Sequence, residues 1–332
     1  MLRSLGLTLA AAWLFAAPGP VRADDVGGET LVIEQAPEPS SDALAEYVGD
    51  AACIACHDAL QQGFAADYSH TRHAKVFSPA NAREESWRNG CEACHGPGSA
   101  HVAAGGGKGV GGLINFQGND PEDVERYGAV CMQCHSGGER RFWAGSVHHS
   151  RDVSCTSCHQ VMRKVSDTAL LSKSTQIATC GGCHQIQNAR QYRNAHMPLR
   201  PGEFNSSTAD DGKMVCGSCH NPHGTISEKL IGGVTVNESC LSCHADKRGP
   251  FLWEHLPVTE DCLNCHDPHG TTRAHMLKMG VPRLCQSCHN ASGHPSTPRS
   301  STDPRFVLGS SCLQCHSSIH GSNHPSGFGL TR

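Results

Sequence analysis

The pentapeptide C-x-x-C-H occurs ten times in this chain of 332 residues and uses all 20 cysteines. A pattern repeated so regularly predicts ten copies of one local structure, each presenting two thiols and one imidazole. We number these motifs 1 to 10 in chain order. Their cysteine pairs are Cys53 and Cys56, Cys91 and Cys94, Cys131 and Cys134, Cys155 and Cys158, Cys180 and Cys183, Cys216 and Cys219, Cys240 and Cys243, Cys262 and Cys265, Cys285 and Cys288, and Cys312 and Cys315.

Three kinds of chemistry use paired cysteines. Exported proteins join them as disulfides, and structural zinc sites also use C-x-x-C pairs. Neither explains why a histidine follows every pair, with no cysteine left over. C-x-x-C-H is the attachment motif of c-type haem, in which two thioethers fix the porphyrin and the histidine binds the iron. The sequence therefore predicts ten covalently bound haem c groups.

The motif histidines are the predicted proximal iron ligands. They are His57, His95, His135, His159, His184, His220, His244, His266, His289 and His316. Thirteen histidines remain, and six of them form the local groups His70/His73, His148/His149 and His320/His324. One histidine from each group and the seven other histidines make ten. Together with the ten motif histidines, they would give each of ten irons two histidine ligands. A methionine on one iron, such as Met132 or Met162, is the alternative and would raise that haem's potential.

Iron with two histidine ligands has no open position for a substrate. The pattern therefore favours an electron-transfer protein that is not an enzyme. A multihaem oxidoreductase is the alternative, and it needs at least one five-coordinate haem. A freely diffusing electron carrier is another. The formal charge of −4 gives no basic excess of the kind that binds nucleic acid.

The rest of the chain predicts an exported, loop-rich protein. Residues 1–23 have the basic start, apolar run and small-x-small end of a secretory signal peptide. Residues 24–50 carry acids and no Lys or Arg, which predicts a flexible leader. Residues 51–332 form the predicted decahaem domain. Weak helical periodicity occurs in Glu122–Cys134 and Val161–Leu171, and no alternating strand pattern is evident.

Two glycine-rich features have different meanings. CGSCHNPHG at Cys216 and CLNCHDPHG at Cys262 are each followed by another motif, which predicts a duplicated two-haem unit. The run Gly105–Gly112 superficially resembles a phosphate-binding loop. Gly109 stands where that loop needs Ser or Thr, so we expect a plain loop.

Four segments between and around the motifs resemble the MtrA- and DmsE-type decahaem cytochromes. They are Cys91–His101, Arg141–Val161, Cys243–Gly270 and Cys315–Gly327, and the resemblance covers essentially Cys53–Arg332. It implies a multihaem cytochrome c fold, loop-rich with short helices and little or no sheet, elongated around its haem chain. It also implies a periplasmic protein associated with the outer membrane through a β-barrel porin.

The resemblance further implies partners and ligands. The partners are the porin and periplasmic and inner-membrane cytochromes, with an outer-surface multihaem cytochrome as a further candidate. The extracellular acceptor or donor, for example iron, and the direction of electron flow stay open. Family-like contexts favour His73 and His148, and the His-Gly sequence favours His320 over His324, although both remain candidates. The predicted distal ligands are His73, His101, His148, His196, His223, His255, His269, His275, His294 and His320.

Overall fold

The computed structural model describes residues 45–60, 63–78, 81, 90–118, 120–191, 194–196, 214–289 and 311–331. The chain divides into a unit at Met1–Asp42 and a unit at Ala43–Arg332, and every described residue belongs to the second. The predicted signal peptide, most of the predicted leader and the distal candidate His294 lie outside the described residues. Everything below concerns the second unit.

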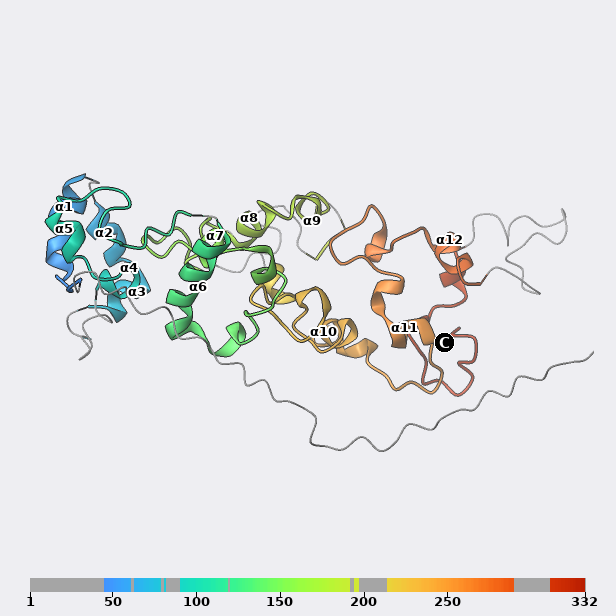
Figure 1. Cartoon of the computed structure of the whole chain (residues 1–332). Helices are drawn as coiled ribbons and strands as arrows, with labels where there is room; N and C mark the ends of the chain where they lie inside the picture. Colours follow the sequence, from blue (N-terminus) through green and yellow to red (C-terminus); the bar gives the residue numbers. More distant parts are fainter. Residues whose placement is uncertain are drawn as a thin grey trace, which may run out of the picture. The chain divides into compact units, whose positions relative to one another are not determined.

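Short helices and long connections make up this unit (Figure 1). The α-helices are α1 (Asp50–Leu60), α2 (Phe64–Ser69), α3 (Arg72–Val76), α4 (Glu92–His95), α5 (Ser99–Ala103), α6 (Pro121–His135), α7 (Cys155–Cys158), α8 (Gln176–Gly181), α9 (Gln185–Ala189), α10 (Val236–Leu241), α11 (Leu256–Glu260) and α12 (Val281–Gln286). The 3-10 turns are η3 (Gly138–Arg140), η4 (His149–Arg151), η5 (Cys216–Ser218), η6 (Glu228–Leu230), η7 (Ala245–Lys247), η8 (Cys262–Asn264), η9 (Ala274–Met276) and η11 (Cys312–Gln314).

The helical prediction is confirmed for one of its two segments. Helix α6 covers Glu122–Cys134, begins with a proline at its first turn and has acidic residues there, which suits the positive end of the helix dipole. The prediction for Val161–Leu171 is wrong, because that segment forms bends and turns. Ala169 and Leu170 have φ of 48° and 52° there, so the backbone leaves the right-handed helical region.

Side-chain caps define where several motif helices begin. Thr175 accepts a hydrogen bond from the backbone N–H of Ala178 at the start of α8, and Thr235 accepts one from Glu238 at the start of α10. Ser154 does the same for α7. Each cap satisfies a donor that a helix of one or two turns would otherwise leave open. The motifs therefore begin at defined positions although their helices are too short to be stable alone.

Only isolated β-bridges, and no named strand, occur among the described residues. Three of them form one repeated turn, in which a motif histidine bridges to a residue further along: His159 to Leu171, His220 to Ile231 and His266 to Leu277. In each turn two consecutive residues before the bridge partner have positive φ. They are Ala169/Leu170, Lys229/Leu230 and His275/Met276. The loop-rich fold class with little or no sheet is confirmed. The repetition also includes the turns that follow motifs 4, 6 and 8.

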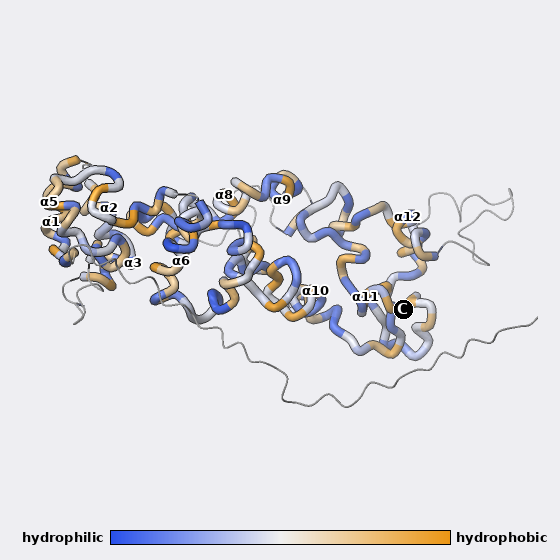
Figure 2. The backbone as a smooth tube through the Cα atoms, in the orientation of Figure 1, coloured by the Kyte–Doolittle hydropathy of each residue, from blue (hydrophilic) through white to orange (hydrophobic). Residues whose placement is uncertain are grey.

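A conventional hydrophobic core is nearly absent from the described part of the chain. Its buried hydrophobic residues are Val124, Tyr127 and Leu171. Figure 2 shows short apolar stretches interrupted by polar ones along the backbone. A large chain normally buries far more apolar surface, so packed side chains are not what organises this unit. None of the described helices combines the length and apolar character needed to cross a membrane.

Candidate functional site

Each C-x-x-C-H motif closes a single helical turn on itself. The histidine N–H donates to the carbonyl of the first cysteine in eight of the motifs, at 2.8 to 3.1 Å. Examples are His95 to Cys91 and His289 to Cys285. Cysteines such as Cys53, Cys56 and Cys91 are not paired in disulfides and occupy half-buried or exposed positions. The turn therefore fixes both sulfurs and the imidazole relative to one another, as covalent haem attachment needs.

The structure places the ring of a second histidine opposite eight of the ten motif histidines. The ring centroids are separated by 6.3 Å for His57 and His101, 5.9 Å for His135 and His73, 6.0 Å for His159 and His223, 6.1 Å for His184 and His148, 6.0 Å for His220 and His269, 6.1 Å for His244 and His196, 6.1 Å for His266 and His320, and 6.1 Å for His289 and His255. All eight second histidines are predicted distal ligands.

This separation fits an iron atom between the two rings. Nitrogens bound on opposite sides of one metal ion, at about 2 Å each, place their ring centroids about 6 Å apart. Direct stacking of two imidazoles would bring them closer, because ring atoms in van der Waals contact lie at about 3.5–4 Å. Each pair therefore leaves room for a metal with its macrocycle, and the residues fit the predicted haem.

Backbone carbonyls fix the orientation of five motif histidines. The Nδ1 atom bonds to Ile114 at 2.6 Å in motif 2, Ala169 at 2.8 Å in motif 4, Lys229 at 2.8 Å in motif 6, His275 at 2.8 Å in motif 8 and Gly329 at 2.5 Å in motif 10. A carbonyl accepts only from a protonated Nδ1, which leaves Nε2 with the lone pair that binds a metal. These five are the even-numbered motifs.

The carbonyls in motifs 4, 6 and 8 belong to the repeated turn. Each comes from the first of the two positive-φ residues, so the unusual backbone aims the acceptor at the imidazole. Sequence reasoning missed these residues because a backbone acceptor leaves no side-chain signature. The turns do leave one faint signal, an apolar pair at a similar distance after each motif: Leu170-Leu171, Leu230-Ile231 and Met276-Leu277.

His275 has a different place from the one expected of a distal ligand. Its backbone carbonyl accepts the hydrogen bond of His266, while the His266 ring faces His320. It occupies the turn position that Ala169 and Lys229 hold elsewhere, where the backbone carbonyl is likewise the acceptor for the motif histidine. The structure therefore does not bring the His275 ring to a motif histidine. No histidine ring is described opposite His95, whose ring contacts Phe116 at 5.3 Å.

In each local group, the histidine that does not face a motif histidine has other contacts. His149 Nε2 lies 3.2 Å from Glu125, and its Nδ1 accepts from the Gly145 N–H at 3.3 Å. His324 Nδ1 is 3.2 Å from the Ser326 N–H and 2.9 Å from its hydroxyl. His70 lines an open cavity of about 600 Å³ together with Asp67, Arg163, Lys164 and Val165. The geometry separates these three from His148, His320 and His73.

Burial keeps several of the paired histidines neutral. Loss of hydration lowers the pKa of His73, His223 and His269, and neighbouring histidines lower it further. The same cause lowers the pKa of His320. Neutral imidazole is the form that binds a metal, so the sites hold their ligands ready at neutral pH.

Neighbouring motifs meet through their cysteines, in chain order and in an alternating way. The first cysteines of neighbouring motifs lie close enough to shift one another's pKa in Cys53–Cys91, Cys131–Cys155, Cys240–Cys262 and Cys285–Cys312. The second cysteines lie near enough for the charge of one to raise the pKa of the other in Cys94–Cys134, Cys158–Cys183, Cys219–Cys243 and Cys265–Cys288. Motifs 5 and 6 are joined by the Gly217 N–H, which donates to Gln176 at 2.6 Å. Every motif thus lies beside the next one in the sequence.

Comparison with known proteins places this arrangement among multihaem cytochromes. A model of NrfB-like cytochrome c-type proteins matches residues 91–183. A doubled CXXCH model matches residues 208–249 and 255–294, which confirms the expected duplicated unit. The multihaem cytochrome MtrA of Shewanella baltica is 42% identical over 250 residues, 73% of this chain and 70% of that protein. The polyhaem cytochrome OmcB of Geobacter sulfurreducens is 27% identical over 225 residues, 57% of this chain and 28% of that protein.

Proposed function

This chain belongs to the MtrA family of multihaem c-type cytochromes, and we propose that it is the electron conduit of a porin–cytochrome complex in the outer membrane. It would carry ten haem c groups after removal of residues 1–23, followed by the leader 24–50 and the haem domain 51–332. Electrons would pass between periplasmic or inner-membrane cytochromes on one side and an extracellular donor or acceptor on the other, directly or through an outer-surface multihaem cytochrome.

The observation that carries this proposal is the continuous order of the sites. Motif follows motif through cysteine or backbone contacts, and eight motif histidines face a second histidine at 5.9 to 6.3 Å. Haem supplies the reversible one-electron chemistry when bound. The chain's own residues hold each iron on both sides and keep neighbouring groups close.

The same ligand pairs support electron transfer over catalysis. An iron held between two imidazoles has no vacant position, and chemistry on a substrate at haem needs one. His275 and His294 are the two distal candidates that remain for motifs 2 and 10. For His275, only the backbone carbonyl is in contact with a motif histidine. Low-temperature electron paramagnetic resonance of the oxidised protein tests this ligation, because iron with two histidine ligands is low spin.

A porin partner accounts for how such a chain would work in a membrane. Loop-rich backbone and haem propionates are costly to expose to hydrocarbon. The lumen of a barrel would shield both. Without a porin, the chain would serve as a diffusing periplasmic carrier, which is the second candidate function.

Reconstitution in vesicles separates these two functions. The mature holoprotein and its cognate porin are inserted together in liposomes that contain a sealed redox dye. We expect an external reductant to reduce the internal dye only when both proteins are present. Vesicles with the porin alone or the cytochrome alone are the controls. Failure of the complete complex to transfer electrons would reject the conduit and leave the carrier.

A further inference from the structure

Three contacts between distant segments repeat one arrangement, which we call clasps 1 to 3. Each clasp joins two segments that are distant in the sequence. The upstream segment ends in the distal histidine of an odd-numbered motif. The downstream segment carries the distal histidine of the even-numbered motif that comes just before that odd-numbered motif in chain order. Clasp 1 joins residues 139–148 to 221–224, clasp 2 joins 190–191 and 194–196 to 267–271, and clasp 3 joins 251–255 to 319–324.

Clasp 1 joins the distal histidines of motifs 4 and 5 through one peptide group. His148, which faces His184 of motif 5, donates from Nδ1 to the Pro222 carbonyl at 2.8 Å. That carbonyl belongs to the peptide bond leading into His223, which faces His159 of motif 4. Asn221 Nδ2 donates to the Glu139 carbonyl at 2.7 Å and holds the two segments together.

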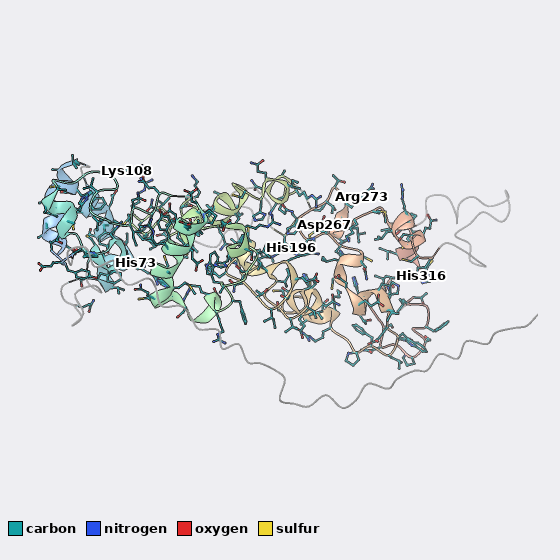
Figure 3. All side chains as sticks on the ribbon, viewed as in Figure 1. His73, Lys108, His196, Asp267, Arg273 and His316 are labelled. Atoms are coloured by element: carbon teal, nitrogen blue, oxygen red, sulfur yellow. The ribbon has the colours of Figure 1, made fainter. Side chains whose placement is uncertain are left out.

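Clasp 2 repeats this for motifs 6 and 7. The Pro268 carbonyl accepts from His196, and the next residue is His269, which faces His220. The segments are held by the Arg190–Asp267 ion pair at 3.1 Å and by the Thr271 N–H donating to the Asn194 carbonyl at 3.0 Å. His196 and Asp267 are labelled in Figure 3.

Clasp 3 has the same plan with a weaker central contact. We call each motif together with its distal histidine a site and give it the number of the motif. The Ile319 carbonyl interacts with His255 of site 9, and Ile319 precedes His320 of site 8. The two main chains exchange hydrogen bonds between Trp253 and Ser322 at 2.8 and 2.9 Å. His255 Nδ1 is buried with no hydrogen bond of good geometry, so this clasp provides proximity without the full bond.

A glycine after the even-numbered distal histidine permits each clasp. Gly224, Gly270 and Gly321 have φ of 115°, 119° and 131°, outside the range open to other residues. A Cβ at these positions would lie 2.0 Å from the Phe142 carbonyl oxygen, 2.3 Å from the Arg190 carbonyl oxygen and 2.2 Å from the Phe251 ring. The opposite backbone is therefore too close for a side chain at Gly224 and Gly270, and the Phe251 ring occupies that space at Gly321.

From these contacts we propose that Pro222 and Pro268, and by position Ile319, are positioning residues that hold the distal ligands of sites 4 and 5, 6 and 7, and 8 and 9 as coupled pairs. This rests on the proposed binding of haem at every motif. A carbonyl on Nδ1 fixes the plane of an axial imidazole and raises its basicity. Because that carbonyl is joined to the neighbouring ligand, displacement of one clasp alters two consecutive sites.

The first test compares two glycine variants of the full-length holoprotein. Gly224→Ala obstructs clasp 1, while the matched control Gly138→Ala changes a glycine with φ of 63° and no atom within 4 Å of the new Cβ. With ten haems verified by mass, electron paramagnetic resonance should show two haem equivalents altered in Gly224→Ala and none in the control. Alteration of one haem or none would overturn the coupling.

A second pair of variants guards against misfolding of Gly224→Ala. His148→Met keeps a ligand for iron but removes the N–H that donates to the Pro222 carbonyl. We therefore expect the electron paramagnetic resonance signals of sites 4 and 5 to change together. His101→Met is the control, since His101 bonds to Val110 at 3.0 Å, and neither neighbour of Val110 is a proposed ligand. It should change site 1 alone. Equal numbers of altered haems in both variants would reject the inference. Fewer than ten haems in the unmodified protein would instead reject the proposed function.

Discussion

Adjacent histidines in this chain have different surroundings. His148 faces a motif histidine and donates to a carbonyl, whereas the neighbouring His149 contacts Glu125 and the Trp143 ring. The chemistry of the two side chains is identical, so only the backbone decides which of them reaches the iron. His149 begins the short turn η4, which points successive residues in different directions.

Substitution of each histidine in turn tests this difference. We predict that His148→Ala opens one iron position, so that one haem of the protein becomes high spin, while His149→Ala leaves all haems low spin. The reason is that His148 alone lies within ligand distance of the site of His184, at 6.1 Å between ring centroids. Electron paramagnetic resonance of the oxidised proteins measures both. The opposite pattern would exchange the two roles.

The sequence predicts the motif residues and most of the second histidines, but it does not predict which second histidine lies opposite which motif. The ten turns and their histidines follow from local spacing, because every atom involved lies within five residues. The pairing of His159 with His223 depends on chain folding across two intervening motifs, which spacing does not encode. His275 shows the limit most clearly, since its residue type suits a ligand but its place in the turn uses the backbone carbonyl.

At the scale of elements, helix α6 is the best-packed part of the described chain. It contains Val124 and Tyr127, two of the three buried hydrophobic residues there. Tyr127 is 1% exposed, donates its hydroxyl to Asn115 at 3.2 Å and accepts from the Gly118 N–H at 2.9 Å. The helix is thereby joined to the loop that leads back to motif 2.

The hydroxyl of Tyr127 should contribute measurably to stability. We predict that Tyr127→Phe lowers the free energy of unfolding by about 1 kcal/mol, because the buried ring loses its part-buried hydrogen bonds with Asn115 and the Gly118 N–H. Guanidinium unfolding followed by circular dichroism measures the change. Tyr47→Phe is the control, since Tyr47 is 38% exposed and a surface change is worth about 0.5 kcal/mol or less. Similar losses in both variants would contradict this role for α6.

At the scale of the whole molecule, the sites form a single file. The described cysteine contacts join each motif only to its neighbours in the sequence, with first and second cysteines alternating. Such an order offers no route around a missing site. The clasps join segments from further apart, but they too connect consecutive sites.

Removal of one interior haem should therefore interrupt the whole path. We predict that Cys240→Ala combined with Cys243→Ala yields a protein with nine haems, one fewer by mass, that no longer transfers electrons across the porin-containing vesicle. Both neighbours of motif 7 lose their contact, through Cys219 and Cys262. Gly138→Ala, with ten haems, is the active control. Undiminished transfer in the double variant would show a bypass and reject the single file.

The direction in which each motif finds its second histidine has a consequence for biogenesis. His184, His244 and His289 face histidines that precede them in the chain, but His159, His220 and His266 face His223, His269 and His320. His223, His269 and His320 come after motifs 6, 8 and 10, and so after two further motifs in each case. A polypeptide that emerges amino end first has both histidines of the former sites as soon as the motif appears, while the latter sites wait until the next two motifs have emerged. We therefore expect staggered assembly of the proposed haem sites, so that a prematurely ended chain would lack the second histidine of an even-numbered motif near its new terminus.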